Sequence, residues 1–371
     1  MYIKNIEIHN FRNYTHLNLS FSKNMNIIYG LNGQGKTNLL ESIYMLALTK
    51  SHRSYKDSNL IKKNEQTADI KATILNDISY NIELILQKTK KTLKIDANKV
   101  ERLASYLTKM NVIIFSSEDI ELIKGGPLSR RKYLNIELSQ ISENYYQALF
   151  DYNKLLKIRN DYLKKISNNE QIDNNYFNVI TEYLINKAVF LYQMRDRYIE
   201  RLNKICPKIY EEISNLKGFQ IKYNPDISIK NFTKEEITNT LQEKYKDNYD
   251  KEVALKMTLY GPHRDDFTFC IENFNLKEFG SQGQQKMAIL TLKLSEIEIF
   301  KDYKKTSPII LLDDVFSDLD ANKQNNLLKR IDKNMQIIIT TTDLVDLKKE
   351  IIKGAKLILI ENGKVIKEEV K

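Results

Sequence analysis

The chain has 371 residues, of which 42% are hydrophobic, and a formal net charge of +10. This length allows two domains or one large domain with an insertion. Two cysteines, Cys206 and Cys270, exclude a disulfide framework and a four-cysteine zinc site. No apolar run approaches the roughly 18 residues of a membrane-spanning helix, so we expect a cytoplasmic protein with no membrane segment. The charge favours a polyanionic partner such as nucleic acid, although lysine is abundant throughout and charge alone also fits a compositional bias.

The N-terminal part of the chain predicts a strand, a turn and two further strands within residues 1–30. Residues 1–8 alternate between polar and apolar side chains and contain no apolar signal core. Residues 10–13 are the expected turn, and residues 17–21 alternate as in a half-buried strand.

Residues 30–37 match G-x-x-x-x-G-K-T, the pattern of a phosphate-binding loop. An apolar strand at 25–29 precedes them and a helical period at 38–46 follows, which is the context that the pattern requires. Glycines let backbone N–H groups cup phosphate oxygens, and the dipole of the new helix favours the same anion. We expect Lys36 to reach the β- and γ-phosphates and to be catalytic, and Thr37 to ligate Mg²⁺. The predicted nucleotide-binding residues of this segment are Gly30, Leu31, Asn32, Gly33, Gln34, Gly35, Lys36, Thr37 and Asn38.

Two features downstream of this helix have both a functional and a structural interpretation. Arg53 is either an outer phosphate contact or a solvated surface arginine. Residues 68–100 alternate like an antiparallel meander, with turns rich in Asn and Asp. This meander carries a lysine patch that fits a DNA surface or a solvated sheet face equally well: Lys88, Lys90, Lys91, Lys94 and Lys99.

The middle of the chain changes character after a buried strand at residues 111–115. From residue 128 to about 257 the apolar spacing of three and four residues predicts long helices. We expect an antiparallel pair whose arms have about 35 residues and so span about 50 Å. The apolar stripes of these helices are interpreted as core.

Two polar loops follow this helical region. Residues 261–266 contain His263, Arg264 and two acids, which a salt-bridged turn would explain. Residues 280–286 lead into a helix, and Ser281 with Gln284 three residues later fits a capping box. A helix N-terminus that follows glycine can receive an anion.

A second element of nucleotide chemistry lies near the C-terminus. Residues 307–314 form a continuous apolar strand that ends in Asp313 and Asp314, as expected for a buried parallel strand whose acids reach a ligand crevice. We expect Asp313 to hold Mg²⁺ through water and Asp314 to polarise the attacking water. A strand at 336–340 and a hairpin at 356–365 complete this part.

Together these motifs resemble the RecF family, which belongs to the ABC-type ATPases related to SMC heads. The resemblance runs nearly end to end. It is carried by residues 10–14, 30–41, 51–53, 127–131, 157–160, 261–266, 281–285, 313–314 and 340–343.

The resemblance implies an α/β ABC-type ATPase head with an inserted helical lobe. The head would combine a RecA-like phosphate-loop sheet with an antiparallel β subdomain. It would comprise residues 1–115 plus 258–371, and the lobe residues 116–257. ATP with Mg²⁺ would close a homodimer on DNA at gaps or single-strand/double-strand junctions, and slow DNA-stimulated hydrolysis would release it.

The same resemblance implies roles for particular residues and partners. Ser281, Gly283 and Gln284 would contact the γ-phosphate of the other subunit, and residues 317–320 match the D-loop. The family acts in recombinational and replication-gap repair and in SOS induction, loading recombinase with the mediator proteins RecR and RecO.

The sequence also departs from the family pattern. Asn135 stands where an Asp is expected, Ser117-Glu118 replaces Pro-Glu, and the second half of the lobe matches weakly. Residues 340–342 are threonines where ABC transporters carry a switch histidine, which agrees with the RecF pattern and with slow hydrolysis. The alternatives are a transporter ATPase subunit and a DNA-binding scaffold with a vestigial nucleotide site. A GTPase is disfavoured because the chain has no Asn-Lys-x-Asp motif.

Overall fold

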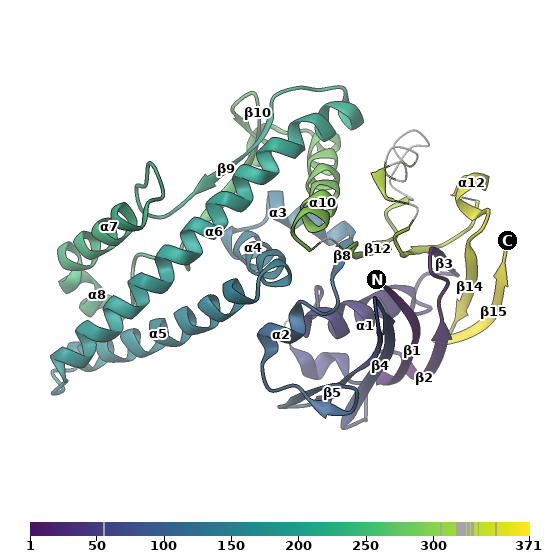
Figure 1. The fold of residues 1–371 in the computed structure, drawn as a ribbon, viewed down its shortest axis with the longest axis horizontal. Coiled ribbons are helices and arrows are strands. Elements are labelled where there is room, and N and C mark those ends of the chain that lie inside the picture. Colours follow the sequence, from purple (N-terminus) through teal and green to yellow (C-terminus); the bar gives the residue numbers. More distant parts are fainter. Residues whose placement is uncertain are drawn as a thin grey trace. The chain divides into compact units, whose positions relative to one another are not determined.

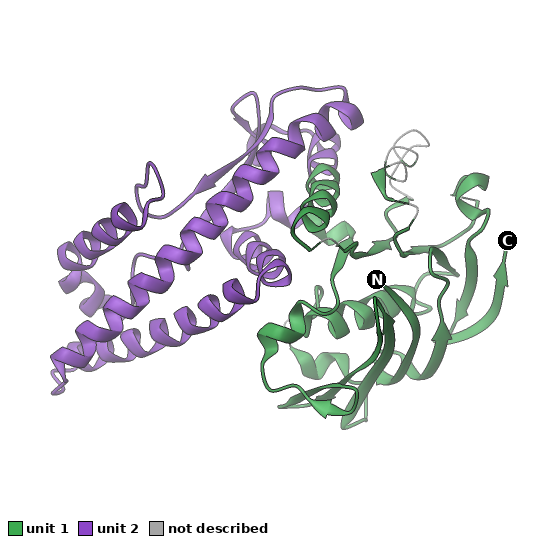
Figure 2. Ribbon diagram, viewed as in Figure 1, with its two compact units in different colours: residues 1–119, 289–371 green, residues 120–288 purple. Residues whose placement is uncertain are grey.

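The protein consists of two compact units (Figure 2), residues 1–119 with 289–371 and residues 120–288. The sequence placed the second boundary at 257/258. Residues 258–288 instead belong to the second unit, because β10 (Asp266–Ile271) pairs along its whole length with β9 (Phe219–Asn224). The computed structural model describes residues 1–54, 56–304, 306–316, 324, 327, 330–332, 334–345 and 347–371.

The first unit contains an antiparallel sheet with strand order β2-β1-β4-β5-β6-β7 (Figure 1). Alternate residues of its long strands are buried, so one face covers the core and the other is polar, as the alternating sequence predicts. The predicted N-terminal strands and the meander are confirmed. The strands are β1 (Tyr2–Phe11), β2 (Tyr14–Ser20), β4 (Thr67–Leu75), β5 (Ser79–Gln87), β6 (Lys91–Ile95) and β7 (Asn98–Lys99).

A second sheet of the first unit has the order β15-β14-β3-β13-β12-β8, and all neighbours pair in parallel except β14 with β15. Strands β8 and β13 are buried throughout, and β12 is buried except at Asp313, which explains their continuous apolar sequences. The predicted hairpin turn is confirmed, with positive φ at Asn362 (50°) and Gly363 (71°). The strands are β3 (Met25–Tyr29), β8 (Val112–Phe115), β12 (Ile309–Asp313), β13 (Ile337–Thr341), β14 (Lys356–Glu361) and β15 (Lys364–Val370).

Helix α1 (Lys36–Leu48) contacts strands of both sheets and is buried on nearly all sides. The second half of the helix, residues 43–48, is apolar on every face, as expected for a helix in that position. The other helices that the structure describes in this unit are short: η1 (Asp57–Leu60), α2 (Leu103–Leu107), η2 (Ser117–Ile120) and α12 (Lys349–Ile352). Helix α10 (Gln282–Lys304) begins in the second unit and ends in the first.

The second unit is mainly helical, and α5 (Glu143–Ser167) packs along α6 (Asn174–Ser214) as the predicted pair (Figure 1). The first predicted arm is wrong in one respect. It is interrupted at Ser142, whose hydroxyl accepts from the Tyr145 N–H and begins a new helix. The prediction of helix up to residue 257 is also wrong where β9 forms. The remaining elements are α3 (Glu121–Lys124), α4 (Pro127–Ile141), α7 (Lys234–Asp247), α8 (Tyr249–Leu255), β11 (Phe274–Asn275) and α9 (Leu276–Phe279).

The polar loop at residues 261–266 is a salt-bridged structure, as its acids suggested. Its partners come from distant helices, because Asp265 pairs with Arg195 at 2.7 Å and Asp266 with Arg130 at 2.5 Å. Within the described residues, no helix combines the length and the hydropathy of a membrane span.

Candidate nucleotide-binding site

The loop between β3 and α1 has the backbone conformation that its glycines predict. Gly30 has φ +142°, and a Cβ atom there would lie 2.4 Å from the carbonyl oxygen of Ile360. Gly35 has φ +114°, and a Cβ atom would lie 2.7 Å from Nδ2 of Asn13. Both positions therefore require glycine for backbone angle, and Gly30 also requires it for space because the obstructing atom belongs to the backbone. No described side chain caps the N-terminus of α1, so its first N–H groups remain available to an anion.

Lys36 begins α1 and turns its side chain back over the loop. Its ammonium donates to the carbonyl oxygens of Gly30 at 2.6 Å and Leu31 at 2.9 Å. Burial lowers the pKa of Lys36, while the carboxylates of Asp314 and Asp313 oppose that shift. The lysine is thus a buried cation that contacts only neutral oxygens of its own loop in the described hydrogen bonds.

Three polar side chains meet where β12 and β13 end beside α1. The hydroxyl of Thr37 donates to Oδ1 of Asp313 at 2.9 Å, and the hydroxyl of Thr340 donates to the same oxygen at 2.8 Å. These strands are parallel neighbours, so their carboxyl ends lie on one edge of the sheet. The structure therefore brings together Lys36, Thr37 and Asp313, as the sequence predicted.

Asp314 lies just beyond β12 and is exposed. Its φ is +54°, and its backbone N–H donates to Oγ1 of Thr340 at 3.0 Å. A positive φ in an aspartate is uncommon and turns the chain sharply after the strand. Thr340 was not predicted as a site residue, yet its hydroxyl is hydrogen-bonded to the side chain of Asp313 and to the backbone of Asp314.

Sequence analysis also missed a set of contacts that hold the loop from outside. The carbonyl oxygen of Gln34 accepts from Nδ2 of Asn13 at 3.2 Å and from the Gly363 N–H at 3.0 Å. The hydroxyl of Tyr14 donates to the carbonyl of Gly35 at 2.9 Å. The signals were present as a turn after β1 and a hairpin turn after β14, but sequence alone does not show that both turns meet this loop.

Arg53 is exposed, and its contacts favour neither of the two predicted interpretations. It donates to Oδ1 of Asn38 at 3.3 Å, and its Nε lies 3.5 Å from a carboxylate oxygen of Glu118. Burial raises the pKa of the Glu118 carboxyl, and the Arg53 charge opposes this. Arg53 is therefore held over the first turn of α1, next to Asn38.

The interior end of the same region is fixed by an arginine–carboxylate fork. Arg12 donates through two nitrogens to Glu41, at 2.8 Å each, and the hydroxyl of Ser51 donates to Glu41 at 2.5 Å. Hydrogen bonds from Arg12 and Ser51 lower the pKa of the Glu41 carboxyl although burial acts in the opposite direction and is the largest single influence. This fork ties the β1–β2 turn to α1.

The capping box before α10 is confirmed. The Ser281 N–H donates to Oε1 of Gln284 at 2.8 Å, and the Gln284 N–H donates to the Ser281 hydroxyl at 3.3 Å. Ser281 and Gly283 are exposed. These residues belong to the second unit, whereas the glycine loop belongs to the first. The predicted D-loop, residues 317–320, lies outside the described residues.

Part of the lysine patch of the meander is engaged in ion pairs. Lys91 lies 2.8 Å from Asp57, and Lys94 lies 2.9 Å from Glu83. This observation favours the solvated-sheet interpretation for those two residues.

The comparisons with known proteins agree with this geometry. The model of the RecF/RecN/SMC N terminal domain matches residues 2–356. The "DNA replication and repair protein RecF" of Clostridium kluyveri is 40% identical over 98% of this chain and 99% of its own. The RecF of Ligilactobacillus salivarius is 36% identical over 99% of this chain and 98% of its own.

Solved structures extend the similarity to the backbone. A structure of the recombination mediator protein RecF-ATP in the RecFOR pathway has a TM-score of 0.92 at 34% identity, covering 100% of this chain and 98% of that one. A crystal structure of an Smc head has a TM-score of 0.55 at 15% identity, covering 100% of this chain and 98% of that one, and shows a shared fold alone. The chain therefore belongs to the RecF family of DNA replication and repair proteins, within the wider RecF/RecN/SMC N-terminal domain family.

Proposed function

We propose that this chain is an ATP-dependent DNA-binding protein of DNA replication and recombinational repair. The observation that carries the proposal is the meeting of Thr37 and Asp313 at 2.9 Å, although 276 positions separate them in the sequence. Beside them the buried ammonium of Lys36 contacts only loop carbonyls in the described hydrogen bonds. A phosphate loop and an acidic strand end in this arrangement support nucleotide binding, and full-length similarity to RecF proteins supports the cellular role.

The nucleotide would occupy the loop from Gly30 to Asn38. Phosphate oxygens are stronger acceptors than peptide carbonyls. The Lys36 ammonium would therefore release the carbonyl oxygens of Gly30 and Leu31 and donate to phosphate oxygens instead. The oxygens of Thr37 and Asp313 are hard donors, and their separation fits the ligand sphere of Mg²⁺, whose bonds are about 2.1 Å long. When bound, Mg²⁺ would neutralise charge on the β- and γ-phosphates.

Slow hydrolysis would use Asp314, whose carboxylate follows the metal-binding acid. The turn at Asp314, fixed by the hydrogen bond of its N–H to Thr340, directs the chain away from the strand end. We propose that Asp314 orients the attacking water and that DNA stimulates this step. Arg53 would contribute an outer phosphate contact from its place beside Asn38.

ATP would act mainly as a switch for assembly. We propose that Ser281, Gly283 and Gln284, at an exposed helix N-terminus, contact the γ-phosphate bound by a second copy of the chain. Closure of such a homodimer on gapped or junction DNA would precede recombinase loading with RecR and RecO in the cytoplasm, and would support SOS induction.

The test is light scattering of the full chain with and without ATP, repeated with gapped DNA. We expect an ATP-dependent dimer that DNA stabilises, and an Asp314→Asn variant that binds ATP but accumulates as the dimer. Wild-type protein without measurable ATP turnover would instead support a scaffold with a vestigial site. Wild-type turnover in Asp314→Asn would assign the water-orienting role to another residue.

A further inference from the structure

Three metal-ligating side chains gather on the polar face of the β1–β2 hairpin. His9 of β1 is directly opposite His16 of β2, and Glu7 lies two residues before His9 on the same face. The neighbouring Ile6 and Ile8 are fully buried, so the three polar side chains point away from the core. Glu7 and His9 are partly exposed and His16 is exposed, which leaves the group accessible to an ion from solvent.

The contacts within this group are short. Nε2 of His9 lies 2.8 Å from a carboxylate oxygen of Glu7, and Nδ1 of His9 lies 3.2 Å from Nδ1 of His16. The two rings have their centroids 4.5 Å apart. One ligand atom from each of the three residues can be chosen so that all lie within 4.8 Å of one another.

We propose that Glu7, His9 and His16 form a binding site for a borderline divalent transition-metal ion of the Zn²⁺ class. Zn–N and Zn–O bonds are about 2.0–2.2 Å long, so the ligand atoms of a tetrahedral site lie about 3.4 Å apart. The ligand atoms already lie within 4.8 Å of one another, so we expect rotation of the exposed side chains to bring them to that spacing. Two imidazoles and one carboxylate suit Zn²⁺, Co²⁺ and Ni²⁺ better than Mg²⁺ or Ca²⁺, which prefer oxygen ligands throughout.

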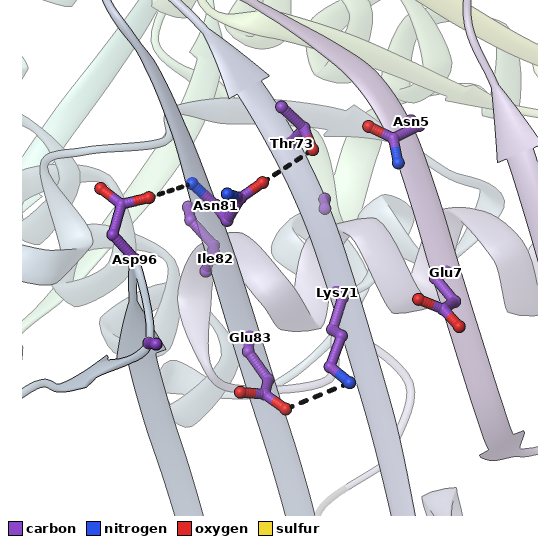
Figure 3. A pocket seen from close by; sticks show the side chains of 10 residues that line it. Asn5, Glu7, Lys71, Thr73, Asn81, Ile82, Glu83 and Asp96 are labelled. Atoms are coloured by element: carbon purple, nitrogen blue, oxygen red, sulfur yellow. Dashed lines mark hydrogen bonds and ion pairs between the residues drawn. The ribbon is translucent and has the colours of Figure 1, made fainter.

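The surroundings leave Glu7 available as a ligand. Lys71, the cation nearby on the same sheet face, makes ion pairs with Asp69 at 3.3 Å and Glu83 at 3.4 Å. Glu7 lines a hollow of about 480 Å³ on this face. Figure 3 shows Lys71 on the strand next to that of Glu7, joined to Glu83 by a dashed line. The lining of that hollow contains three carboxylates, Glu7, Glu83 and Asp96, and one lysine, Lys71. Glu83 is paired with both Lys71 and Lys94, whereas the carboxylate of Glu7 faces His9.

Three protein ligands leave a coordination position for water or another molecule, unlike the four-ligand shell of a purely structural zinc site. The ion would join β1 to β2 near the turn that contacts the nucleotide loop through Asn13 and Tyr14. We therefore expect metal binding to stabilise this hairpin. The site does not depend on the proposed ATPase function, because it shares no residue with the nucleotide site.

The test uses the full chain, purified without a polyhistidine tag, in competition with a chromophoric zinc chelator. We expect one equivalent of Zn²⁺ per chain, with at least a tenfold loss of affinity in His9→Ala and in His16→Asn. The matched control is Asn18→Ala, which changes the polar residue directly opposite Glu7 on β2 and should bind Zn²⁺ as the wild type does.

Two further measurements make the outcome decisive. Co²⁺ should give an intense ligand-field absorption in the wild type and in Asn18→Ala but not in the histidine variants, and Zn²⁺ should raise the melting temperature in the same pattern. Circular dichroism and ATP affinity will show that the variants are folded. Failure of the wild type to bind Zn²⁺ at micromolar concentration, or full binding in both folded histidine variants, would overturn the proposal.

Discussion

Lys36 in the first unit and Arg195 in the second are both buried cations, but their partners differ in kind. Lys36 donates to carbonyl oxygens of its own loop. Arg195 donates to Asp265 at 2.7 Å, with 2% and 0% of the two side chains exposed, and to Asn135 and Tyr145. Loop carbonyls can be exchanged for phosphate at little cost, whereas the buried carboxylate of Asp265 loses its charge partner at 2.7 Å if the arginine leaves.

A second buried pair shows that this difference is general in the helical unit. Arg159 lies 2.6 Å from Glu252, and its guanidinium stacks 4.3 Å from the ring centroid of Tyr245. The other oxygen of Glu252 accepts from the Leu259 N–H at 2.7 Å. Such groups position helices relative to loops within the unit. In this chain the buried cation at the candidate ligand site, Lys36, has replaceable partners, whereas Arg195 and Arg159 have fixed ones.

The largest expected effect comes from a substitution that breaks the buried ion pair of Arg195 with Asp265. Arg195→Met should cost about 3–5 kcal/mol of unfolding free energy, because Asp265 becomes an uncompensated buried charge. Chemical denaturation of the full chain, followed by hydrogen exchange in α6, measures this effect. ATP affinity of the folded fraction should remain unchanged.

The matched control is Arg264→Met, in the same loop but exposed, which should change stability by less than about 0.5 kcal/mol. Equal destabilisation by both substitutions would contradict the structural role of Arg195.

The next largest effect is expected on ATP affinity, when the buried cation of Lys36 is removed. Lys36→Met should weaken ATP binding by about 100-fold, because charged hydrogen bonds to phosphate contribute about 1.5–3 kcal/mol. Its unfolding free energy should stay near that of the wild type, since only neutral carbonyls lose a partner. Titration with a fluorescent ATP analogue measures the affinity, and exposed Lys63→Met is the control. Unchanged ATP affinity and dimerisation in Lys36→Met would refute the placement of the nucleotide.

A smaller effect is expected on how the stability of the helical unit depends on pH, through Asp226 and His263. Burial raises the pKa of Asp226 to about 7, and burial lowers the pKa of His263 to about 4. A raised carboxyl pKa makes the folded state retain a proton that the unfolded state has lost, so Asp226 lowers stability as the pH rises from about 4 to 7. His263 acts in the opposite direction between about pH 4 and 6.5, because the unfolded state binds the extra proton there.

Asp226→Asn removes only the first of these contributions. The unfolding free energy of the variant should therefore increase more steeply with pH between about 4 and 7, by on the order of 2 kcal/mol over that range. Denaturant titrations at several pH values give the slope. Parallel curves for variant and wild type would show that Asp226 ionises normally in the folded protein.

Periodicity and motif context made most of the first unit predictable. The alternation of β4 and β5, the apolar runs of β12 and β13 and the glycine pattern before α1 each reflect a local requirement for burial or backbone angle. Lys36 and Thr37 were predicted from the phosphate-loop pattern, and Asp313 was predicted because the carboxyl ends of buried parallel strands lie at a ligand crevice.

The parts that sequence did not predict depend on contacts between distant segments. Thr340 reaches Asp313 only because β13 lies beside β12, and the second unit extends to residue 288 only because β9 pairs with β10. At position 135 the resemblance led us to expect an Asp, and the amide oxygen of Asn135 accepts from Arg195 at 2.9 Å. Because Asp265 already neutralises the charge of Arg195, a neutral hydrogen-bond acceptor at position 135 is sufficient to bind the remaining guanidinium nitrogen.

The last prediction concerns Ser281, whose role as a helix cap is distinguishable from a role in dimerisation. As a cap alone, Ser281 stabilises α10 through the Gln284 N–H, and its loss costs about 1 kcal/mol. Ser281→Ala and Ser281→Arg should therefore destabilise the chain similarly.

If the exposed serine also contacts the γ-phosphate bound by a second copy, only arginine adds bulk and obstructs the approach of the two chains. Ser281→Arg should then bind ATP as a monomer yet fail to dimerise, while Ser281→Ala retains partial dimerisation. Mixing Ser281→Arg with Lys36→Met restores one composite site of unaltered halves, so light scattering should detect mixed dimers that neither variant forms alone. Normal ATP-dependent dimers of Ser281→Arg would limit Ser281 to its own helix and would remove the clamp mechanism.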